Sequence, residues 1–374
     1  MGKKYILRLL LLGCLAFVSN FSFAQESERQ TFVDEDIKVD KSADEKENIN
    51  KAVDLALLDS HFYGFFSDEE AGKHYGFHLP VIIVDDGIKI FSSAEFDFGN
   101  NIVEKDGNYY VYYRSKIYKT DASGELTFNE KGFPTNKKPL DLSITKNVFS
   151  SILIAILMIL IFVSMAKTYK NNQLPKGFGR VLEPMIVFIR DDIAKNSIGP
   201  KYHKFTGFLL TIFFFILFLN LFGMMPFGTN VTGSITVTIA LAMITFFVTQ
   251  FSGNKNYWKH IFWFPDVHPI VKIILIPIEL LGMITKPFSL MIRLFANMTA
   301  GQVMGMMFVG FIFIFRTWVA GTAFFGFSIF ISILGLLVAF LQAYIFTLLS
   351  SLYIAAAVEE EHTSEEDTEE LPIV

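Results

Sequence analysis

The sequence predicts a polytopic, all-α membrane protein of about five membrane segments, with a small β-rich module on its N-terminal side. Hydrophobic residues make up 52% of the 374 residues, and the mean hydropathy is +0.42. Charged residues make up 18%, whereas a soluble domain carries about a quarter. The charges crowd residues 1–147, residues 167–204 and the last 16 residues, and they are sparse between residues 205 and 358. Long uncharged stretches between charged loops are typical of a chain that crosses a membrane several times.

Composition also excludes some functions. The net charge of −5 is dominated by the two ends of the chain, and no basic patch points to nucleic acid. The single cysteine, Cys14, lies in the leader region, so the mature chain is expected to have no thiol. Disulfides and thiolate metal sites are then excluded.

Residues 1–24 have the features of a cleavable signal peptide. These features are the basic Lys3 and Lys4, the apolar run from Ile6 to Val18, and the small-x-small site Ser22-Phe23-Ala24. Cleavage after Ala24 would place Gln25 and everything that follows it outside the cytoplasm of a bacterium. Two alternatives stay open, namely lipoprotein processing at Cys14 and a retained anchor helix.

Two extramembrane parts follow the signal. Residues 25–52 are rich in Glu, Asp, Lys and Asn, which predicts a disordered or loosely helical segment. Residues 53–140 contain β-branched and aromatic runs separated by Asp-Gly turns, which predicts a β-rich, extracytoplasmic module. The runs are Val81–Val84, Ile88–Phe91 and Tyr109–Tyr113, and the turns are Asp86-Gly87 and Asp106-Gly107.

His74 and His78 of this module are weighed as metal ligands. Gly76 lies between them and weakens a helical pair, and histidines at a surface without a metal are far commoner. We therefore expect no metal site.

Residues 145–358 form the predicted membrane domain. Its first three uncharged segments are Val148–Ala166, Phe205–Met225 and Val231–Phe251, and each is long enough to span a bilayer. The loop between the first two contains eight Lys or Arg residues, which predicts a cytoplasmic loop by the positive-inside rule. Within that loop, Val181–Ile193 mixes apolar and charged residues and suits a position along the membrane surface.

The last two apolar segments are unusually long. Ile270–Phe315 has 46 residues and Thr322–Val358 has 37, which as helices would be about 69 Å and about 55 Å long. Since a bilayer core is about 30 Å thick, the segments must tilt strongly, break or leave the bilayer. Pro277 and Pro287 could break the first, but we favour two long tilted helices. The acidic tail, residues 359–374, is expected in the cytoplasm.

Three ionisable residues interrupt the first long segment. Glu279, Lys286 and Arg293 follow one another at intervals of seven residues, so all three fall close to one face of a helix. An arginine at mid-bilayer costs about 2.5–3.5 kcal/mol on insertion scales, and its guanidinium cannot lower this cost by losing its proton. Arg293 is therefore the leading functional residue. The alternative, a structural pair or an interfacial position, suits Glu279 and Lys286 better, because they lie nearer the cytoplasmic start of the segment.

Elsewhere the membrane segments carry neutral polar groups. The most prominent are the amides of Asn220, Gln302 and Gln342. Such groups could hold a file of water molecules, or they could simply link helices by hydrogen bonds. Both interpretations stay open.

Arg293 lies in the run Ser289-Leu-Met-Ile-Arg293-Leu-Phe-Ala-Asn297-Met-Thr-Ala-Gly301. This run resembles the signature S-L-x-x-R-L-F-x-N-x-x-A-G of the ATP synthase subunit a family. Other stretches are similar to further motifs of that family: Pro277-Ile278-Glu279 with Lys286-Pro287, Asn220–Pro226, Asn230–Gly233 and Leu341–Leu349. The resemblance covers about residues 145–361. It does not extend over residues 25–140, a part that is shorter in the common family pattern.

The resemblance implies a stator beside a rotating ring of c subunits in a bacterial inner membrane. Two offset half-channels would lead ions, with protons as the expected species, to and from a carboxylate on each c subunit. Arg293 would face that carboxylate, and Lys286 would be a supporting charge. We expect the half-channels to be lined by Asn220, Asn297, Gln302, Gln342, Glu279 and Ser289. Other implied partners are the subunit b stalk and the soluble ATPase head. The N-terminus would be periplasmic and the C-terminus cytoplasmic, and no cofactor is expected.

The sequence departs from the family pattern in one respect. Many family members carry an ionisable group one residue after the Ala-Gly of the arginine motif, and a paired group seven residues before the Gln of L-Q-A. Here these positions hold Gln302 and Gly335, neither of which titrates. We therefore expect an outer path lined by neutral groups, with Glu279 on the cytoplasmic side.

Two other classes of protein remain as alternatives. An independent secondary transporter could use the same intramembrane charges, but the sequence shows no inverted repeat. A non-conducting scaffold could present the β-rich module, but neither alternative explains the matching motifs. No phosphate-binding Gly-rich loop occurs, so the chain itself is not expected to hydrolyse ATP.

Overall fold

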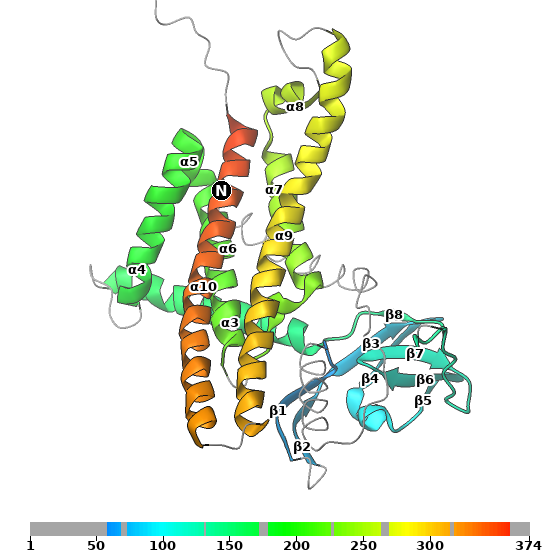
Figure 1. Cartoon of the computed structure of the whole chain (residues 1–374). Helices are drawn as coiled ribbons and strands as arrows, with labels where there is room; N and C mark the ends of the chain where they lie inside the picture. The colour runs from blue at the N-terminus through cyan, green and yellow to red at the C-terminus, as the bar shows by residue number, and fades with distance from the viewer. Residues whose placement is uncertain are drawn as a thin grey trace, which may run out of the picture. The chain divides into compact units, whose positions relative to one another are not determined.

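The computed structural model describes residues 58–68, 73–130, 132–171, 179–225, 228–262, 269–314 and 318–359 (Figure 1). The expectations for residues 1–24 and 25–52, and nearly all of the acidic tail, lie outside these residues. The chain divides into two compact units, which are described separately. Unit 1 comprises Met1–Ser164, Phe215–Ala240 and Met291–Gln342; unit 2 comprises Met165–Phe214, Leu241–Leu290 and Ala343–Val374.

The N-terminal part of unit 1 is a β-rich module of three small antiparallel sheets (Figure 1). The orders within the sheets are β1-β2, β4-β3-β8 and β5-β6-β7. The strands are β1 Phe62–Asp68, β2 Lys73–His78, β3 Pro80–Val84, β4 Ile88–Ser92, β5 Val103–Lys105, β6 Asn108–Tyr113, β7 Lys116–Thr120 and β8 Leu140–Asp141; a 3-10 turn, η1 Ser93–Gly99, follows β4.

The two predicted Asp-Gly turns are confirmed. Asp86 and Gly87 connect β3 to β4 with φ of 53° and 130°, and Asp106 and Gly107 connect β5 to β6 with φ of 52° and 74°. Positive φ is the conformation that short hairpin loops require, and Asp-Gly adopts it readily. The turns therefore fix β3–β4 and β5–β6 as hairpins.

The sheets β4-β3-β8 and β5-β6-β7 share one apolar core. It consists of Val81, Ile83, Phe91, Phe96, Val103, Tyr110 and Ile117. These residues alternate along the strands with more exposed ones, as expected of strands with one buried face.

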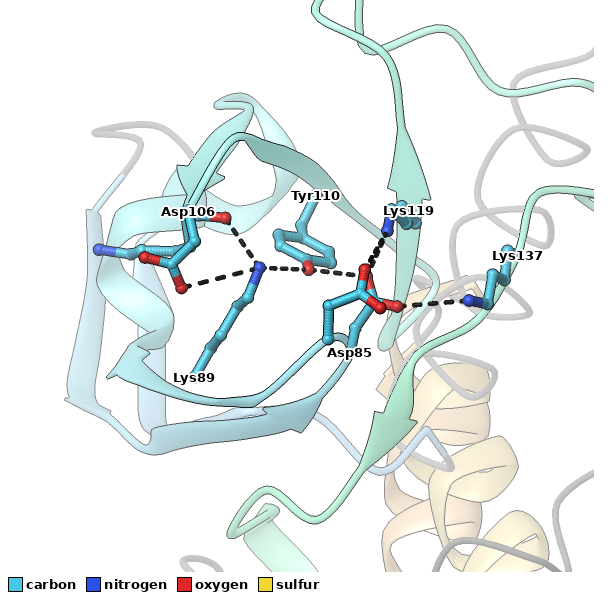
Figure 2. A network of polar contacts seen from close by, with 8 residues as sticks. Asp85, Lys89, Asp106, Tyr110, Lys119 and Lys137 are labelled. Atoms are coloured by element: carbon cyan, nitrogen blue, oxygen red, sulfur yellow. Dashed lines mark hydrogen bonds and ion pairs between the residues drawn. The ribbon is translucent and has the colours of Figure 1, made fainter.

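A polar network lies at the edge of this core (Figure 2). Asp85 is 6% exposed, and its carboxylate accepts hydrogen bonds from Lys119 Nζ at 2.7 Å, Tyr110 Oη at 3.0 Å and Lys137 Nζ at 3.3 Å. Lys89 Nζ donates to Tyr110 Oη at 3.1 Å. The hydrogen bond from Lys119 is the largest influence on the carboxyl and, against the effect of burial, lowers the pKa of Asp85 to about 2. A buried charge is tolerated here because it is paired and hydrogen-bonded.

The module is joined directly to the first long helix, α3 Lys146–Asn171. Asp59 Oδ1 accepts the backbone N–H of Asn147 at 3.1 Å, and Asp59 Oδ2 accepts the hydroxyl of Thr145 at 2.8 Å. The N–H of Lys146 donates to the carbonyl of Ser60 at 2.9 Å. The bonds from Asn147 and Lys146 satisfy backbone donors that the start of a helix leaves without an intrahelical partner.

The rest of the described chain is helical. After α3 come α4 Gly179–Phe188, the π-helix η2 Ile189–Lys195, α5 Asn196–Ile198, η3 Gly199–Lys201, α6 Tyr202–Gly223, η4 Val231–Gly233, α7 Ile235–Ser252, α8 Lys255–Phe262, α9 Pro269–Ile314 and α10 Trp318–Val358. Five stretches of the described residues are long and apolar enough to span a membrane: Lys146–Tyr169, Gly179–Gly223, Ile235–Ser252, Ile274–Phe308 and Gly321–Val358. The prediction of about five membrane segments is confirmed.

The two long C-terminal segments are single helices of 46 and 41 residues. Pro277 and Pro287 lie inside α9 without ending it, which membrane helices tolerate when nearby groups satisfy the freed carbonyls. α10 begins at Trp318, four residues before the predicted start at Thr322. The predicted third segment is shortened at its start, because a separate 3-10 turn, η4, occupies Val231–Gly233.

In unit 2 the C-terminal end of α10 is capped by other segments. The backbone N–H of Asn254 donates to the carbonyl of Ala357 at 2.9 Å. Asn254 Nδ2 and Lys201 Nζ donate to the carbonyl of Val358 at 2.9 Å and 3.3 Å. The last carbonyls of a helix have no intrahelical donor. These hydrogen bonds supply donors to two of them and so stabilise the C-terminal end of α10.

Candidate functional site

Arg293, in the unit 1 part of α9, is half-buried. Leu290, Met291 and Leu294 beside it in the sequence are buried. Within the described part of the chain, no ion pair or hydrogen bond involves the guanidinium. Arg293 therefore carries a permanent positive charge that no carboxylate among the described residues balances.

One helical turn beyond Arg293, an amide pair links α9 to α10. Asn297 Nδ2 donates to Gln342 Oε1 at 2.8 Å. Gln342 is 2% exposed, so this bond satisfies an acceptor that water reaches poorly. Two of the predicted lining residues are therefore in direct contact.

The amide of Asn220 joins three segments of unit 1. Asn220 lies in α6 and is fully buried. Its Oδ1 accepts the hydroxyl of Thr232 at 2.8 Å, and its Nδ2 donates to the carbonyl of Ala339 in α10 at 3.4 Å. Asn220 therefore connects α6 to both η4 and α10.

Gln302 is held by Asn230, a residue that the sequence analysis did not select. Asn230 Nδ2 donates to Gln302 Oε1 at 2.5 Å and to the carbonyl of Met298 at 3.4 Å. Asn230 Oδ1 accepts the N–H of Gly233 at 3.0 Å, which makes Asn230 the cap of η4. The side chain that caps this turn thus also fixes the amide of Gln302.

Gly335 lies in the part of α10 that belongs to unit 1. A Cβ atom at this position would lie 3.2 Å from Met224 Cε. The space beside Gly335 is therefore occupied closely by a methionine side chain. Sequence reasoning missed Asn230 and Thr232 although both lie in the noted run Asn230–Gly233, because their partners are distant in sequence.

Unit 2 contains the other predicted charges, on the first half of α9. Among the described residues, neither Glu279 nor Lys286 forms an ion pair. Lys286 Nζ lies 5.6 Å from the centre of the Tyr353 ring, a cation–π contact. Burial raises the pKa of the Tyr257 phenol, and the charge of Glu279 adds to the rise. Ser289 is exposed.

Lys286 also lines a small, partly polar pocket in unit 2. Its polar lining residues are Thr245, Thr249, Gln250, Tyr257, Lys286 and Tyr353. The amide of Gln250 and the hydroxyl of Tyr257 are within hydrogen-bonding distance, at 3.2 Å and 3.3 Å. No sequence signal distinguished these hydroxyl and amide groups from ordinary helix contacts.

These features define a multi-pass membrane protein with sparse polar and charged groups inside long apolar helices. Residues 148–355, more than half of the chain, match the family described as ATP synthase A chain. The chain belongs to this family. A second match covers residues 52–142, which are similar to a family described as Domain of unknown function (DUF8433).

Several relatives named ATP synthase subunit a are similar to the chain. The protein of Chloroherpeton thalassium is 44% identical over 234 residues, which cover 60% of this chain and 70% of that protein. The protein of Chlorobium phaeobacteroides is 40% identical over 278 residues, or 70% of this chain and 79% of that protein. The protein of Myxococcus xanthus is 40% identical over 230 residues, or 60% and 75%.

Proposed function

We propose that this chain is the ion-translocating stator subunit of a rotary F-type ATP synthase, with two half-channels that meet at Arg293. Membership of the ATP synthase A chain family supports this proposal. The observation that carries it is the half-buried guanidinium of Arg293, which has no counterion among the described residues. The counterion in the assembly would be the carboxylate of a c subunit.

The chemistry of such a contact follows from electrostatics. In lipid the carboxyl group of a c subunit is neutral, because desolvation raises its pKa; beside a fixed guanidinium it ionises. The carboxyl would therefore release its proton into one half-channel as it approaches Arg293, and would take up another proton from the second half-channel as it moves away from Arg293 into the lipid. The charge of Arg293 would also block a direct leak between the half-channels. The driving energy is about 2.3 kcal/mol per charge for each 100 mV of membrane potential.

The outer half-channel would be lined by neutral amides. We assign it Asn220, Asn297, Gln302 and Gln342, which lie on α6, α9 and α10 of unit 1. A side-chain amide offers two donors and an acceptor with two lone pairs, so one helix-linking hydrogen bond leaves capacity for water. The linking bonds hold the helices in place. Asn297 and Gln302, which are not buried, would also hydrogen-bond to a file of water, whereas Asn220 and Gln342 are buried and would position the path.

The inner half-channel would use the polar groups of unit 2. Glu279 would accept ions on the cytoplasmic side, with Ser289 along the path. Lys286 would raise the local positive potential, which suits its position beside the hydroxyls and amides of the pocket.

The partners proposed for the chain are the c-subunit ring, the subunit b stalk and the soluble ATPase head, within a bacterial inner membrane. We place the N-terminal β-rich module in the periplasm and residues 359–374 in the cytoplasm. The basic loop at residues 167–204 supports this orientation by the positive-inside rule.

Co-purification tests the proposal directly. The full chain carries an affinity tag after Val374, and the membrane is extracted in mild detergent. We expect the c-ring and the ATPase head to purify with the chain in constant ratio. An independent transporter would purify alone and move ions in liposomes without these partners, and that result would overturn the proposal.

A further inference from the structure

The β1–β2 hairpin carries a patch of aromatic side chains on one face, the aromatic face, which consists of Tyr63, Phe65, Tyr75 and Phe77. Tyr63 and Phe77 are paired across the strands and their rings stack at 5.2 Å. Phe65 follows at a β-bulge and contacts both rings, at 5.6 Å and 6.0 Å. Tyr75, two residues before Phe77 in β2, lies on the same side because side chains alternate along a strand.

The aromatic face is partly uncovered. Phe65 is 43% exposed and Tyr75 is 44% exposed. Single exposed aromatic residues are common on protein surfaces. A contiguous apolar patch, in contrast, marks a surface that binds another protein, a ligand or a membrane. The element that the hairpin contacts indicates what binds to this patch.

That element is the first turn of α3. The ring of Phe149 lies 5.3 Å from Tyr63 and 5.1 Å from Phe77, edge to face in both cases. α3 is one of the five candidate membrane-spanning stretches among the described residues. Its start is fixed to the module because the N–H groups of Asn147 and Lys146 donate to the Asp59 carboxylate and to the Ser60 carbonyl. The hairpin therefore lies at the level where α3 enters the apolar part of the membrane.

Phe149 is half-buried and is followed along α3 by a stripe of exposed residues. One side of a helix is formed by residues at intervals of three or four positions. Counted from Phe149, these are the positions 3, 4, 7, 11 and 14 residues further along α3. All of them are exposed large apolar residues: Ile152, Leu153, Ile156, Leu160 and Val163. The aromatic face is thus continuous with a surface that faces lipid when α3 spans the bilayer.

We propose that the aromatic face of the β1–β2 hairpin inserts into the headgroup region of the bilayer, beside the N-terminal end of α3. Tyrosine combines an apolar ring with a polar hydroxyl, and for this reason it gathers at membrane interfaces; the two phenylalanine rings add apolar area. The hairpin then anchors the β-rich module on the lipid surface and sets the depth of the first turn of α3. The partner is the lipid itself.

Spin labelling of the full chain in phosphatidylcholine vesicles tests this proposal. The chain has a single cysteine, Cys14, so Cys14→Ser gives a background without thiols. Labels are attached in Tyr75→Cys and, separately, in Phe65→Cys. The matched controls are Ile88→Cys and Ile90→Cys on β4, which are also apolar and are 72% and 68% exposed but belong to another sheet.

Collision with oxygen, which concentrates in lipid, is compared with collision with a water-soluble nickel chelate. We expect labels at positions 65 and 75 to collide mainly with oxygen, with a several-fold higher oxygen-to-nickel ratio than labels at positions 88 and 90. A nickel-dominated signal at 65 and 75 would show that the face is in water. Protection from both reagents would show that protein covers it, either another segment or a second copy. Either result overturns the proposal, and the two label positions report independently should one substitution disturb the hairpin.

Discussion

Asn297 donates a hydrogen bond to the buried Gln342 over 2.8 Å, and this bond joins α9 to α10 one helical turn beyond Arg293. Leaving a buried amide without its partner costs about 1–3 kcal/mol, whereas removing both partners can be nearly neutral. The two amides should therefore behave as a unit.

A double-mutant cycle tests this coupling. We expect Asn297→Leu and Gln342→Leu each to lower the thermal stability of the purified chain and the rate of ATP-driven pumping by the assembled complex. The double variant should recover part of the stability, because no orphaned amide remains. Strictly additive losses in stability would show that the bond is not what couples the helices.

Gln302 provides a test of the neutral outer path. Gln302→Glu should be tolerated, because Asn230 Nδ2 already donates to the acceptor atom at this position and a carboxylate is a stronger acceptor. Gln302→Leu should slow pumping without stopping it. The measurement is proton uptake by inverted vesicles at equal complex content.

Both extreme results for Gln302→Leu would be informative. Complete loss of pumping would mean that one amide is indispensable and that a water path is wrong. Unchanged pumping would move the path elsewhere and favour a purely helix-linking role. Asn230→Leu is the matched variant, since it removes the partner and leaves Gln302 itself intact.

The Asp85 network predicts a pH dependence of the β-rich module. The folded-state pKa of Asp85 is about 2, below its ordinary value of 3.8, so the ionised carboxyl stabilises the fold at neutral pH. This contribution is lost as the pH falls from about 4 to about 2. Near-UV circular dichroism of the tyrosines, followed during thermal unfolding, should show a lower midpoint for Asp85→Asn at pH 7.

The difference between Asp85→Asn and the parent chain should shrink toward pH 2, where the parent carboxyl is also protonated. Asp86→Asn is the control, because Asp86 is exposed and lies 3.5 Å from the same Lys119; exposed ion pairs contribute little. A pH-independent difference, or an equal effect of Asp86→Asn, would contradict the assigned role of Asp85.

The orientation of the chain is a separate prediction. The mature protein should begin at Gln25, with the β-rich module outside the cytoplasm and residues 359–374 inside. N-terminal sequencing of the purified protein and protease treatment of intact spheroplasts check both points. Protection of the module from external protease would show that the orientation is inverted.

Local sequence patterns predicted the elements that depend on local chemistry. Asp86-Gly87 and Asp106-Gly107 predicted two hairpins, because positive φ is a property of the turn residues themselves. The length of the apolar segments predicted α9 and α10, although the sequence left open whether Pro277 would break the first. The structure shows a continuous helix there.

Contacts between distant segments were not predictable from one sequence. β8 pairs Leu140 with Val84 of β3, and nothing in the two-residue strand itself marks it as β. Asn230 and Gln302 are 72 residues apart, so their contact exists only once η4 and α9 are placed together. The sequence identified the polar residues of the site, but their partners depend on tertiary packing.

Arg293→Ala tests the central claim most directly, by ATP-driven proton pumping in inverted membrane vesicles. We expect pumping to be abolished while the complex remains assembled, because no other residue would supply the fixed positive charge opposite the c-ring carboxylate. Arg190→Ala is the control; Arg190 is an exposed arginine paired with Asp191 at 2.7 Å, and its loss should leave pumping intact. Near-normal pumping by Arg293→Ala, at equal complex content, would contradict the assignment of Arg293.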